Sequence, residues 1–342
     1  MFDRDILILK DQEVRCLLSG RELDLIDTVR RAYQAHASGD SSLPHSTFLR
    51  FPDNDRNRII ALPVYLGGEF NRAGLKWIAS FPENRTQGLD RASAVIILNS
   101  IETGRPEAIL EGSTISARRT AASAALAAKH FHNDERLSTV GLIGCGLINF
   151  EIAKFLLAIW PRIERFVIYD LLEDAAREFE RKCARLSDRI EVVIGSSIKT
   201  VLKNAPLISV ATVASKPHIV DLADCSLGST ILNISLRDLA PGVILACDNV
   251  VDDIDHVCRE QTSIHQTEQL VGNRDFIRCT LGEILNGRAP ARKDPNDIVV
   301  FSPFGLGVLD IAVASLVVDR ATAEERGIRI DSFLPERWTR GS

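Results

Sequence analysis

The chain has 342 residues, of which 45% are hydrophobic and 25% charged, and its formal net charge is -5. This length allows a large buried core and suggests two domains rather than one. The acidic balance argues against nucleic acid as a partner, and no apolar run approaches the ~20 residues of a membrane span. We therefore expect a cytoplasmic protein that contacts neither nucleic acid nor a membrane.

The first third of the chain changes its pattern near residue 40. A strand over Ile6–Leu9 and a helix over residues 20–37 are predicted first. Residues 44–112 then form short β segments punctuated by Pro, Gly and Asn, which is typical of an antiparallel sheet. Arg50 and Lys76 lie on these segments. Because side chains alternate along a strand, Lys76 points away from its apolar neighbours, either to solvent or into a cleft.

A helix is predicted over residues 113–131, with Ser or Thr available as its N-cap. Arg118 and Arg119 lie in its first turns, where the helix dipole is already positive. Such a pair suggests a bound carboxylate or phosphate. Two solvated arginines on a surface helix are an equally good interpretation.

The stretch from Thr139 to Asp170 carries the clearest ligand signal. An apolar run leads into Gly144-Cys-Gly146-Leu-Ile-Asn149, a helical pattern follows, and a second apolar run ends at Asp170. In a strand–turn–helix unit, Gly144 permits a sharp turn, Gly146 permits approach of a pyrophosphate, and the acid binds the adenosine ribose. This acid favours NAD over NADP. Asn149 replaces the usual third glycine, and a tight turn with no ligand is the alternative.

The next hundred residues alternate between helical and extended patterns. We expect a helix over residues 172–186 and strands over residues 191–194, 206–212, 230–234 and 243–248. This alternation predicts a doubly wound parallel sheet, whose ligands bind outside the carboxyl ends of its strands. Thr212, Ser235 and Asp238 lie at or just after such ends. Asp238 has the chemistry of a general base, although by position alone a solvated loop acid is the better interpretation.

The last third is polar up to about residue 297. A strand over residues 298–301 then leads through Gly305 and Gly307 into an apolar helix over residues 308–318. The glycines bring backbone near a cofactor or only shape a turn. Phe333, Leu334 and Trp338 in the polar tail are available to dock on the first domain. The cysteines and histidines show no paired ligand spacing, so we predict no metal site.

Four motifs together resemble the ornithine cyclodeaminase/μ-crystallin family over nearly the whole chain. They are Gly74-Leu-Lys76-Trp-Ile-Ala-Ser-Phe-Pro82-Glu-Asn84, Glu102-Thr-Gly104-Arg-Pro106, Ala117-Arg-Arg119-Thr-Ala-Ala and Val140-Gly-Leu-Ile-Gly144-Cys-Gly146. Two further stretches, Pro44-His-Ser-Thr-Phe-Leu-Arg50 and Phe301-Ser-Pro-Phe-Gly-Leu-Gly-Val-Leu-Asp310, look most like the branch that forms L-2,3-diaminopropionate for siderophores and some peptide antibiotics.

The resemblance implies an α/β protein: a doubly wound Rossmann domain plus an α+β domain with a mostly antiparallel sheet. Residues 1–115 plus 320–342 would bind substrate and form a homodimer, and residues 116–319 would bind NAD. The implied catalytic residues are Asp238 and Lys76. Substrate-binding residues would be Arg50, Lys76 and Arg119. Cofactor-binding residues would be Arg91, Arg119, Gly144, Gly146, Leu147, Ile148, Asp170, Thr212 and Ser235.

The implied activity is that of an NAD-dependent oxidoreductase acting on a CH–NH group. The substrate, N-((2S)-2-amino-2-carboxyethyl)-L-glutamate, would be oxidised and hydrolysed to L-2,3-diaminopropionate and 2-oxoglutarate with release of NADH. Arg91 replaces a family threonine, and the sequence around Asp238 lacks the cyclodeaminase pattern, so ornithine is the less suitable substrate. Ornithine cyclodeaminase, a ketimine reductase or alanine-type dehydrogenase, and a non-enzymatic nucleotide-binding protein remain alternatives. A regulatory role linked to DNA binding has no support in the acidic charge balance.

Overall fold

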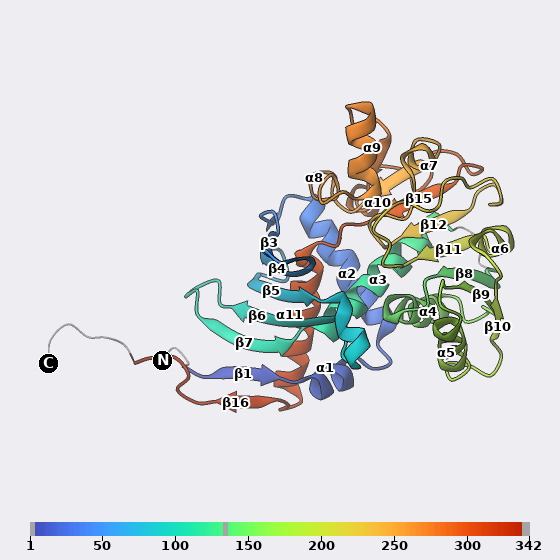
Figure 1. The fold of residues 1–342 in the computed structure, drawn as a ribbon. Helices are drawn as coiled ribbons and strands as arrows, with labels where there is room; N and C mark the ends of the chain where they lie inside the picture. Colours follow the sequence, from blue (N-terminus) through green and yellow to red (C-terminus); the bar gives the residue numbers. More distant parts are fainter. Residues whose placement is uncertain (1–3, 133–135, 337–342) are drawn as a thin grey trace, which may run out of the picture. The chain divides into compact units, whose positions relative to one another are not determined.

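The structure, a computed structural model, describes residues 4–132 and 136–336. It divides into two compact units, each with its own sheet (Figure 1). Unit 1 comprises Met1–Arg21, Ser38–Arg119 and Gly307–Ser342, and unit 2 comprises Glu22–Ala37 and Thr120–Leu306. Within the described ranges, no helix is long and apolar enough to cross a membrane.

Unit 1 is built on a mostly antiparallel sheet in the order β16-β1-β7-β6-β5-β4-β2, with β3 paired to β4. Only the β1–β7 pair is parallel among these described strands. The elements of unit 1 are β1 (Ile6–Leu9), α1 (Asp11–Leu18), β2 (Ser41–Ser42), β3 (Thr47–Phe51), β4 (Asn54–Leu66), β5 (Arg72–Ser80), η1 (Pro82–Gln87), β6 (Ala92–Asn99), β7 (Pro106–Glu111), the start of α3 (Ser113–Phe131), α11 (Gly307–Ala323) and β16 (Ile328–Ile330). The predicted antiparallel sheet is confirmed.

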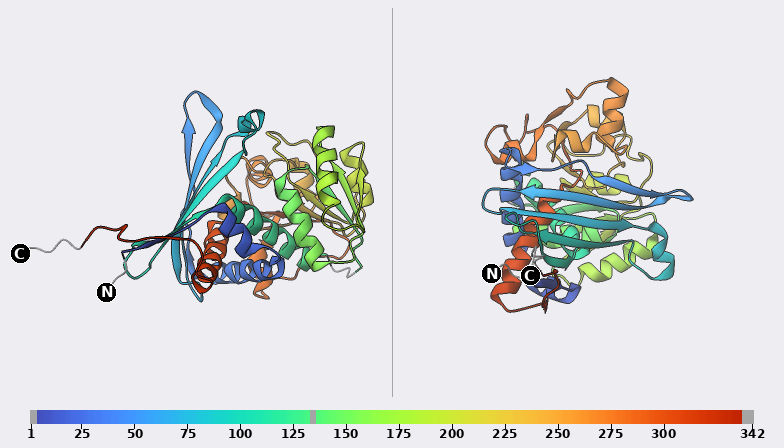
Figure 2. Two further views of the ribbon diagram at one scale, coloured as in Figure 1. Left: turned by 90° about the horizontal axis from the view of Figure 1, so that it is seen from below. Right: turned by 90° about the vertical axis from the view of Figure 1, so that its left-hand side faces the viewer.

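Helix α11 crosses one face of this sheet and packs on β4, β5 and β6 (Figures 1 and 2). Gly74 in β5 allows the close approach, because a Cβ atom there would lie 2.8 Å from Ile311 Cδ1 of the helix. Val308, Ile311 and Ala312 are fully buried by this packing. The contact brings the first turn of α11 onto the strand that carries Lys76.

Unit 2 contains a parallel sheet in the order β10-β9-β8-β11-β12-β15-β13-β14. Its elements are α2 (Glu22–Ala37), the rest of α3, β8 (Thr139–Ile143), α4 (Leu147–Ile159), β9 (Arg165–Tyr169), α5 (Glu173–Cys183), β10 (Glu191–Ile194), α6 (Ile198–Asn204), β11 (Leu207–Val210), β12 (Thr230–Asn233), α7 (Pro241–Leu245), β13 (Asp248–Val251), α8 (Ile254–Val257), α9 (Ser263–Val271), β14 (Ile277–Thr280), α10 (Leu281–Leu285) and β15 (Val299–Ser302). The predicted doubly wound fold is confirmed.

The strand order of unit 2 reverses at β8, with β9 on one side and β11 on the other. In open α/β sheets, the crevice at such a reversal is where ligands bind, outside the carboxyl ends of the strands. All four residues of β11 and four of the five in β8 are buried. These central strands are therefore covered on both faces of the sheet, as is usual for a parallel sheet. The residues that follow β8 and β11 therefore lie where ligands of this fold bind.

The structure corrects several predicted boundaries. The apolar helix before residue 320 belongs to unit 1, because α11 packs on the antiparallel sheet, and the early helix α2 belongs to unit 2, because it packs on α4 and α10. The expected division at 115/116 and 319/320 therefore differs from the compact units. The predicted strand over 243–248 is wrong: Pro241–Leu245 is helix, with Pro at its start, and β13 begins at Asp248.

The C-terminal tail extends the sheet of unit 1. β16 pairs with β1 in antiparallel register, Ile6 opposite Ile330, and the Leu334 N–H donates to the Arg4 carbonyl at 3.0 Å. Phe333 remains about half exposed. Trp338, which was expected to dock on the first domain together with Phe333 and Leu334, lies outside the described residues.

Candidate functional site

The turn after β8 has the geometry that its two glycines predict. Gly144 has φ +92°, and a Cβ atom there would lie 2.9 Å from the Ala211 carbonyl carbon and 3.3 Å from the Thr212 nitrogen, at the end of β11. A side chain at residue 144 would therefore separate the two strand ends. Gly146 is the N-cap of α4, and no side-chain hydrogen bond caps the helix there. Leu147, whose side chain is exposed, begins the helix.

Asn149, which departs from the usual glycine pattern, holds this turn in place. It is fully buried, and its Nδ2 donates to the carbonyl oxygens of Ile143 at 2.9 Å and Gly144 at 2.7 Å. Its Oδ1 accepts a hydrogen bond from Ser209 Oγ of β11 at 2.7 Å. The amide thus connects the end of β8 to β11. Ile148, beside it, is half-buried.

Asp170 follows β9 and reaches back to the same turn. Its Oδ2 accepts a hydrogen bond from the Cys145 N–H at 2.7 Å, and its Oδ1 accepts one from the Leu172 N–H at 3.0 Å. Each carboxylate oxygen can accept a second bond. The side chain is half-buried, so the remaining acceptor capacity is available to a sugar hydroxyl group.

Asp238 is fully buried in the loop after β12, so the interpretation as a solvated loop acid is wrong. Its Oδ1 accepts hydrogen bonds from the Thr212 hydroxyl and from His218 Nε2, the latter at 2.8 Å. Among the described residues, none donates to its Oδ2. Ser235 lies in the same loop, and its hydroxyl donates to the Val210 carbonyl at 3.0 Å. Thr212, which was predicted to bind the cofactor, therefore donates a hydrogen bond to Asp238, the predicted catalytic acid.

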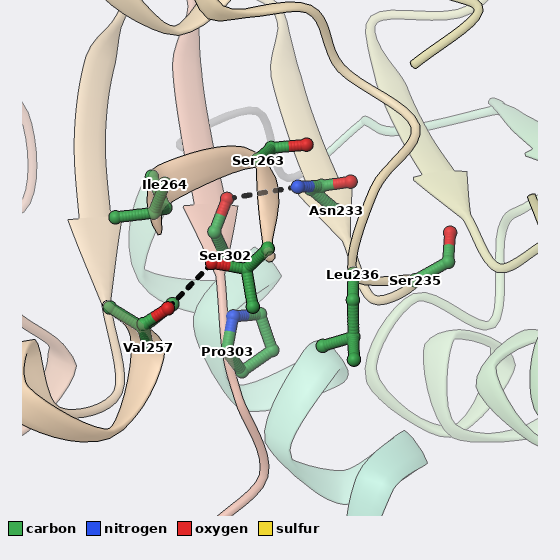
Figure 3. A pocket seen from close by; sticks show the side chains of 9 residues that line it. Asn233, Ser235, Leu236, Val257, Ser263, Ile264, Ser302 and Pro303 are labelled. Carbon is green, nitrogen blue, oxygen red and sulfur yellow. Dashed lines mark hydrogen bonds between the residues drawn. The ribbon is translucent and has the colours of Figure 1, made fainter. Parts of the chain in front are cut away.

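A small recess lies beside this loop, at the carboxyl ends of β12 and β15 (Figure 3). Its wall includes Asn233, whose Nδ2 donates to Ser302 Oγ at 3.1 Å, and the hydroxyl of Ser263. Within the described part of the chain, Asn233 Oδ1 and Ser263 Oγ have no hydrogen-bond partner although both are buried. The edge of the sheet is thus polar where ligands of this fold bind.

The loop after β15, in which Gly305 was predicted either to bring backbone near a cofactor or only to shape a turn, is held by a buried acid. Asp252 accepts hydrogen bonds from the N–H groups of Phe304 at 2.9 Å and Gly305 at 2.7 Å. Burial raises the pKa of Asp252, and the two main-chain donors oppose that rise. The acid fixes the loop, and Gly305, with φ +97°, permits the turn.

In unit 1, the side chains of Lys76 and Arg119 both contact the carboxylate of Asp310, a residue that was not predicted as part of a site. Asp310, in the first turn of α11, contacts Lys76 Nζ at 2.6 Å and Arg119 Nε at 3.0 Å, and Ser116 Oγ lies 3.2 Å from Lys76 Nζ. Lys76 is 2% exposed, Arg119 7% and Asp310 0%. A solvent-exposed Lys76 and a solvated Arg119 are therefore both wrong. We call Lys76, Ser116, Arg119 and Asp310 the cationic cluster.

The cationic cluster carries one more positive than negative charge when its side chains are ionised. Burial lowers the pKa of Lys76 to about 8, the neighbouring Arg119 lowers it as well, and Asp310 opposes the shift. The ammonium form therefore predominates at neutral pH and is lost in mildly alkaline solution. A buried excess of positive charge suits an anionic ligand.

Arg50 and Arg91 lie elsewhere in unit 1. Arg50 is exposed on β3, with its guanidinium carbon 5.3 Å from the centre of the Phe48 ring. Arg91 is half-buried just before β6, and its carbonyl accepts a hydrogen bond from the Phe81 N–H at 2.8 Å. Their roles toward substrate and cofactor remain predictions.

Within residues 4–132 and 136–336, no group of three or more His, Cys, Asp or Glu side chains is arranged to hold a metal ion. The seven cysteines are free thiols. Cys145 lies in the turn after β8, and burial, together with the charge of Asp170, raises its pKa to about 12. Its thiol therefore stays protonated and is a poor nucleophile.

Sequence reasoning missed Asp310 and His218. A single acid in the apolar pattern over 308–318 was the available signal for Asp310, because a buried carboxylate requires a cationic partner. For His218 the signal was its place shortly after a predicted strand end, on the ligand side of the sheet.

Comparison with known proteins agrees with this architecture. A family model for the ornithine cyclodeaminase/mu-crystallin family matches residues 5–325. N-((2S)-2-amino-2-carboxyethyl)-L-glutamate dehydrogenase of Staphylococcus aureus is 31% identical over 338 residues, which cover 97% of this chain and 100% of that protein.

Two solved structures extend the similarity to the fold. Thermococcus litoralis Delta(1)-pyrroline-2-carboxylate reductase, in complex with NADH and L-proline, has a TM-score of 0.88 at 25% identity and covers 94% of this chain and 99% of its own. An archaeal alanine dehydrogenase dimer with bound NAD has a TM-score of 0.84 at 26% identity, with 96% and 99% covered. On the family match and the whole-length relative together, the chain belongs to the ornithine cyclodeaminase/mu-crystallin family.

Proposed function

We propose that the protein is an NAD-dependent oxidoreductase that converts N-((2S)-2-amino-2-carboxyethyl)-L-glutamate and water to L-2,3-diaminopropionate and 2-oxoglutarate, with release of NADH. The observation that carries the proposal is the end-to-end similarity to the S. aureus dehydrogenase named for that substrate. The buried residues Lys76, Arg119 and Asp238 supply the charges that such a reaction needs.

The turn after β8 fits a dinucleotide. Gly144 and Gly146 have no side chains that would keep a ligand away from the backbone. The first turn of α4 contains no acid, and no side chain caps it, so its N–H groups are suited to bind a pyrophosphate. Asp170 would accept hydrogen bonds from the ribose and repel a 2′-phosphate, which favours NAD. When bound, NAD supplies a hydride acceptor.

The cationic cluster is assigned to the substrate, which carries three carboxylates. Lys76 and Arg119 already share Asp310, so the cluster retains one net positive charge for an incoming anion. The guanidinium of Arg119 contacts Asp310 through Nε, and its terminal nitrogens offer donors in the fork geometry that matches a carboxylate. Arg50 is the further candidate for a carboxylate.

Asp238 is assigned to the hydrolytic half of the reaction. Oxidation of the amine leaves a carbon–nitrogen double bond, and water must lose a proton as its oxygen bonds to that carbon. The bare Oδ2 of Asp238 is the atom suited to accept the proton. That proton then passes to the nitrogen, and the second proton leaves the hydroxyl group as the carbon–oxygen double bond forms and the carbon–nitrogen bond breaks. Both protons of the water thus end on the departing amine, and the carboxylate is regenerated.

A homodimer is proposed through the face of the unit 1 sheet that α11 does not cover. Leu49, Trp77 and Val95 are each more than 40% exposed there, and Trp77 lies opposite Ala61 and Val95 in register. A hollow of about 700 Å³ lined by Pro63, Leu75 and other residues lies on the same face. Exposed apolar surface of this kind marks an interface. Trp77→Lys should shift the mass measured by light scattering from dimer to monomer; an unchanged mass would contradict this interface.

The alternative functions differ in whether NADH is formed, consumed or left unchanged overall. A cyclodeaminase would form proline and ammonia from ornithine without net NADH, and a reductase or alanine-type dehydrogenase would consume NADH with an imine, or with pyruvate and ammonium. A non-enzymatic member would bind nucleotide without turnover. Absorbance of NADH with each substrate in turn, together with measurement of the proline and ammonia formed from ornithine, separates all four outcomes. The proposal predicts net NADH with the aminocarboxyethyl-glutamate, and faster turnover of any other substrate would replace it.

A further inference from the structure

The two carboxylate oxygens of Asp238 have different surroundings. Oδ1 accepts hydrogen bonds from the Thr212 hydroxyl and from His218 Nε2 at 2.8 Å. Oδ2 is equally buried and receives no hydrogen bond from the part of the chain that the structure describes. The carboxylate is therefore held by hydrogen bonds to Oδ1, whereas Oδ2 has no donor among the described residues.

The main chain holds His218 against this acid. The N–H groups of His218 and Ile219 both donate to the Asp238 carbonyl, at 3.0 and 2.9 Å, and the Ala240 N–H donates to the Ile219 carbonyl at 3.0 Å. An isolated parallel bridge pairs Ile219 with Leu239. The histidine loop and the acid loop are thus held in register. The imidazole contact is a consequence of that register rather than of a mobile side chain.

We propose that His218 is a positioning residue for Asp238: with Thr212 it fixes Oδ1, so that Oδ2 is the oxygen that takes the proton from water. The inference rests on the proposed function, in which Asp238 is the general base. Because a carboxylate can only accept, Nε2 carries the proton of this contact and Nδ1 is directed elsewhere. The His218 side chain is 33% exposed, whereas that of Asp238 is 0% exposed.

The orientation of the carboxylate decides where the lone pairs of Oδ2 point. When two donors hold Oδ1, the buried carboxylate keeps one orientation, and so do the lone pairs of Oδ2. A charge-assisted hydrogen bond is short and directional, and it is stronger in a dry site than in water. Without the imidazole, Thr212 alone would hold Oδ1, and the carboxylate would be free to rotate away from the attacking water.

The kinetic test compares two substitutions at residue 218. His218→Leu removes the donor, and turnover should fall about tenfold to a hundredfold, the range that a hydrogen bond to a charged group supports, with KM changed by less than about twofold. His218→Gln places an amide N–H at similar reach and should restore most of the turnover. His265→Gln, a histidine on α9 that contacts Gln269, is the matched control and should retain the wild-type rate. Wild-type turnover in His218→Leu would overturn the inference, as would failure of His218→Gln to improve on it.

A second readout does not depend on activity. In protein labelled with ¹⁵N-histidine, the His218 resonance, assigned by its loss in His218→Gln, should be that of a ring protonated at Nε2. Asp238→Asn should shift that resonance and leave those of the other histidines in place. A ring protonated only at Nδ1, or no shift in Asp238→Asn, would overturn the inference even if no substrate were turned over. Absence of turnover in the wild-type protein, with the resonance as expected, would instead contradict the proposed function.

Discussion

Replacing Asp310 by Asn is expected to destabilise unit 1. The substitution keeps the side chain's size and removes the charge that Lys76 Nζ and Arg119 Nε contact at 2.6 and 3.0 Å. Because both cations are almost fully buried, neither would be stabilised by water in place of the acid. Breaking a buried ion pair costs about 3–5 kcal/mol of the free energy of unfolding. Asn retains one acceptor oxygen, so we expect the lower end, about 3 kcal/mol.

Chemical denaturation followed by tryptophan fluorescence measures this loss. Trp77 adjoins Lys76 in β5, and replacing Trp160 and Trp338 by Phe makes it the single reporter. Asp319→Asn is the matched control, since Asp319 lies on the same helix, is 64% exposed and contacts Arg72 at 3.2 Å. Such an exposed pair is worth less than about 1 kcal/mol. Equal losses in Asp310→Asn and Asp319→Asn would refute the counter-ion argument.

Three further predictions concern the remaining charges. The pKa of Lys76 is lowered to about 8, first by burial, so its positive charge is lost as pH rises through that value; KM for the substrate should rise about tenfold from about pH 7 to about pH 9, and a flat KM would contradict the assignment. Asp238→Asn should reduce turnover at least about a hundredfold while NAD affinity, measured by fluorescence titration, stays within about twofold; undiminished turnover would remove Asp238 from the mechanism. Asp170→Ala should improve binding of NADP relative to NAD at least about tenfold, about 1.4 kcal/mol, in the same titration, and an unchanged ratio would show that Asp170 does not select the nucleotide.

The parts of the fold that sequence could predict are local. The turn between β8 and α4 and the acid after β9 are encoded within about thirty residues, by glycines, an apolar helix face and a strand pattern, so their order alone predicts a βαβ unit. Asp238 could be placed at the ligand edge because every parallel strand ends on the same side. The buried state of its carboxylate depends on Thr212 and His218, which no periodicity connects to it.

Contacts between distant segments could not be predicted. Asp310 is 234 positions from Lys76 and 191 from Arg119, and only the packing of α11 on β5 brings them together. Asn149 stands where glycine is usual, and the structure gives its amide three hydrogen bonds, two to the main chain at Ile143 and Gly144 and one to Ser209 of β11. The short apolar run at 243–248 reads equally as strand or helix, and Pro241 decides for helix by starting α7.

Product analysis tests the central claim most directly. Wild-type protein incubated with NAD and N-((2S)-2-amino-2-carboxyethyl)-L-glutamate should form NADH, 2-oxoglutarate and L-2,3-diaminopropionate in equal amounts, with the acids quantified by mass spectrometry and NADH by absorbance. Failure to consume this amine, or its consumption without one NADH for each 2-oxoglutarate, would contradict the account.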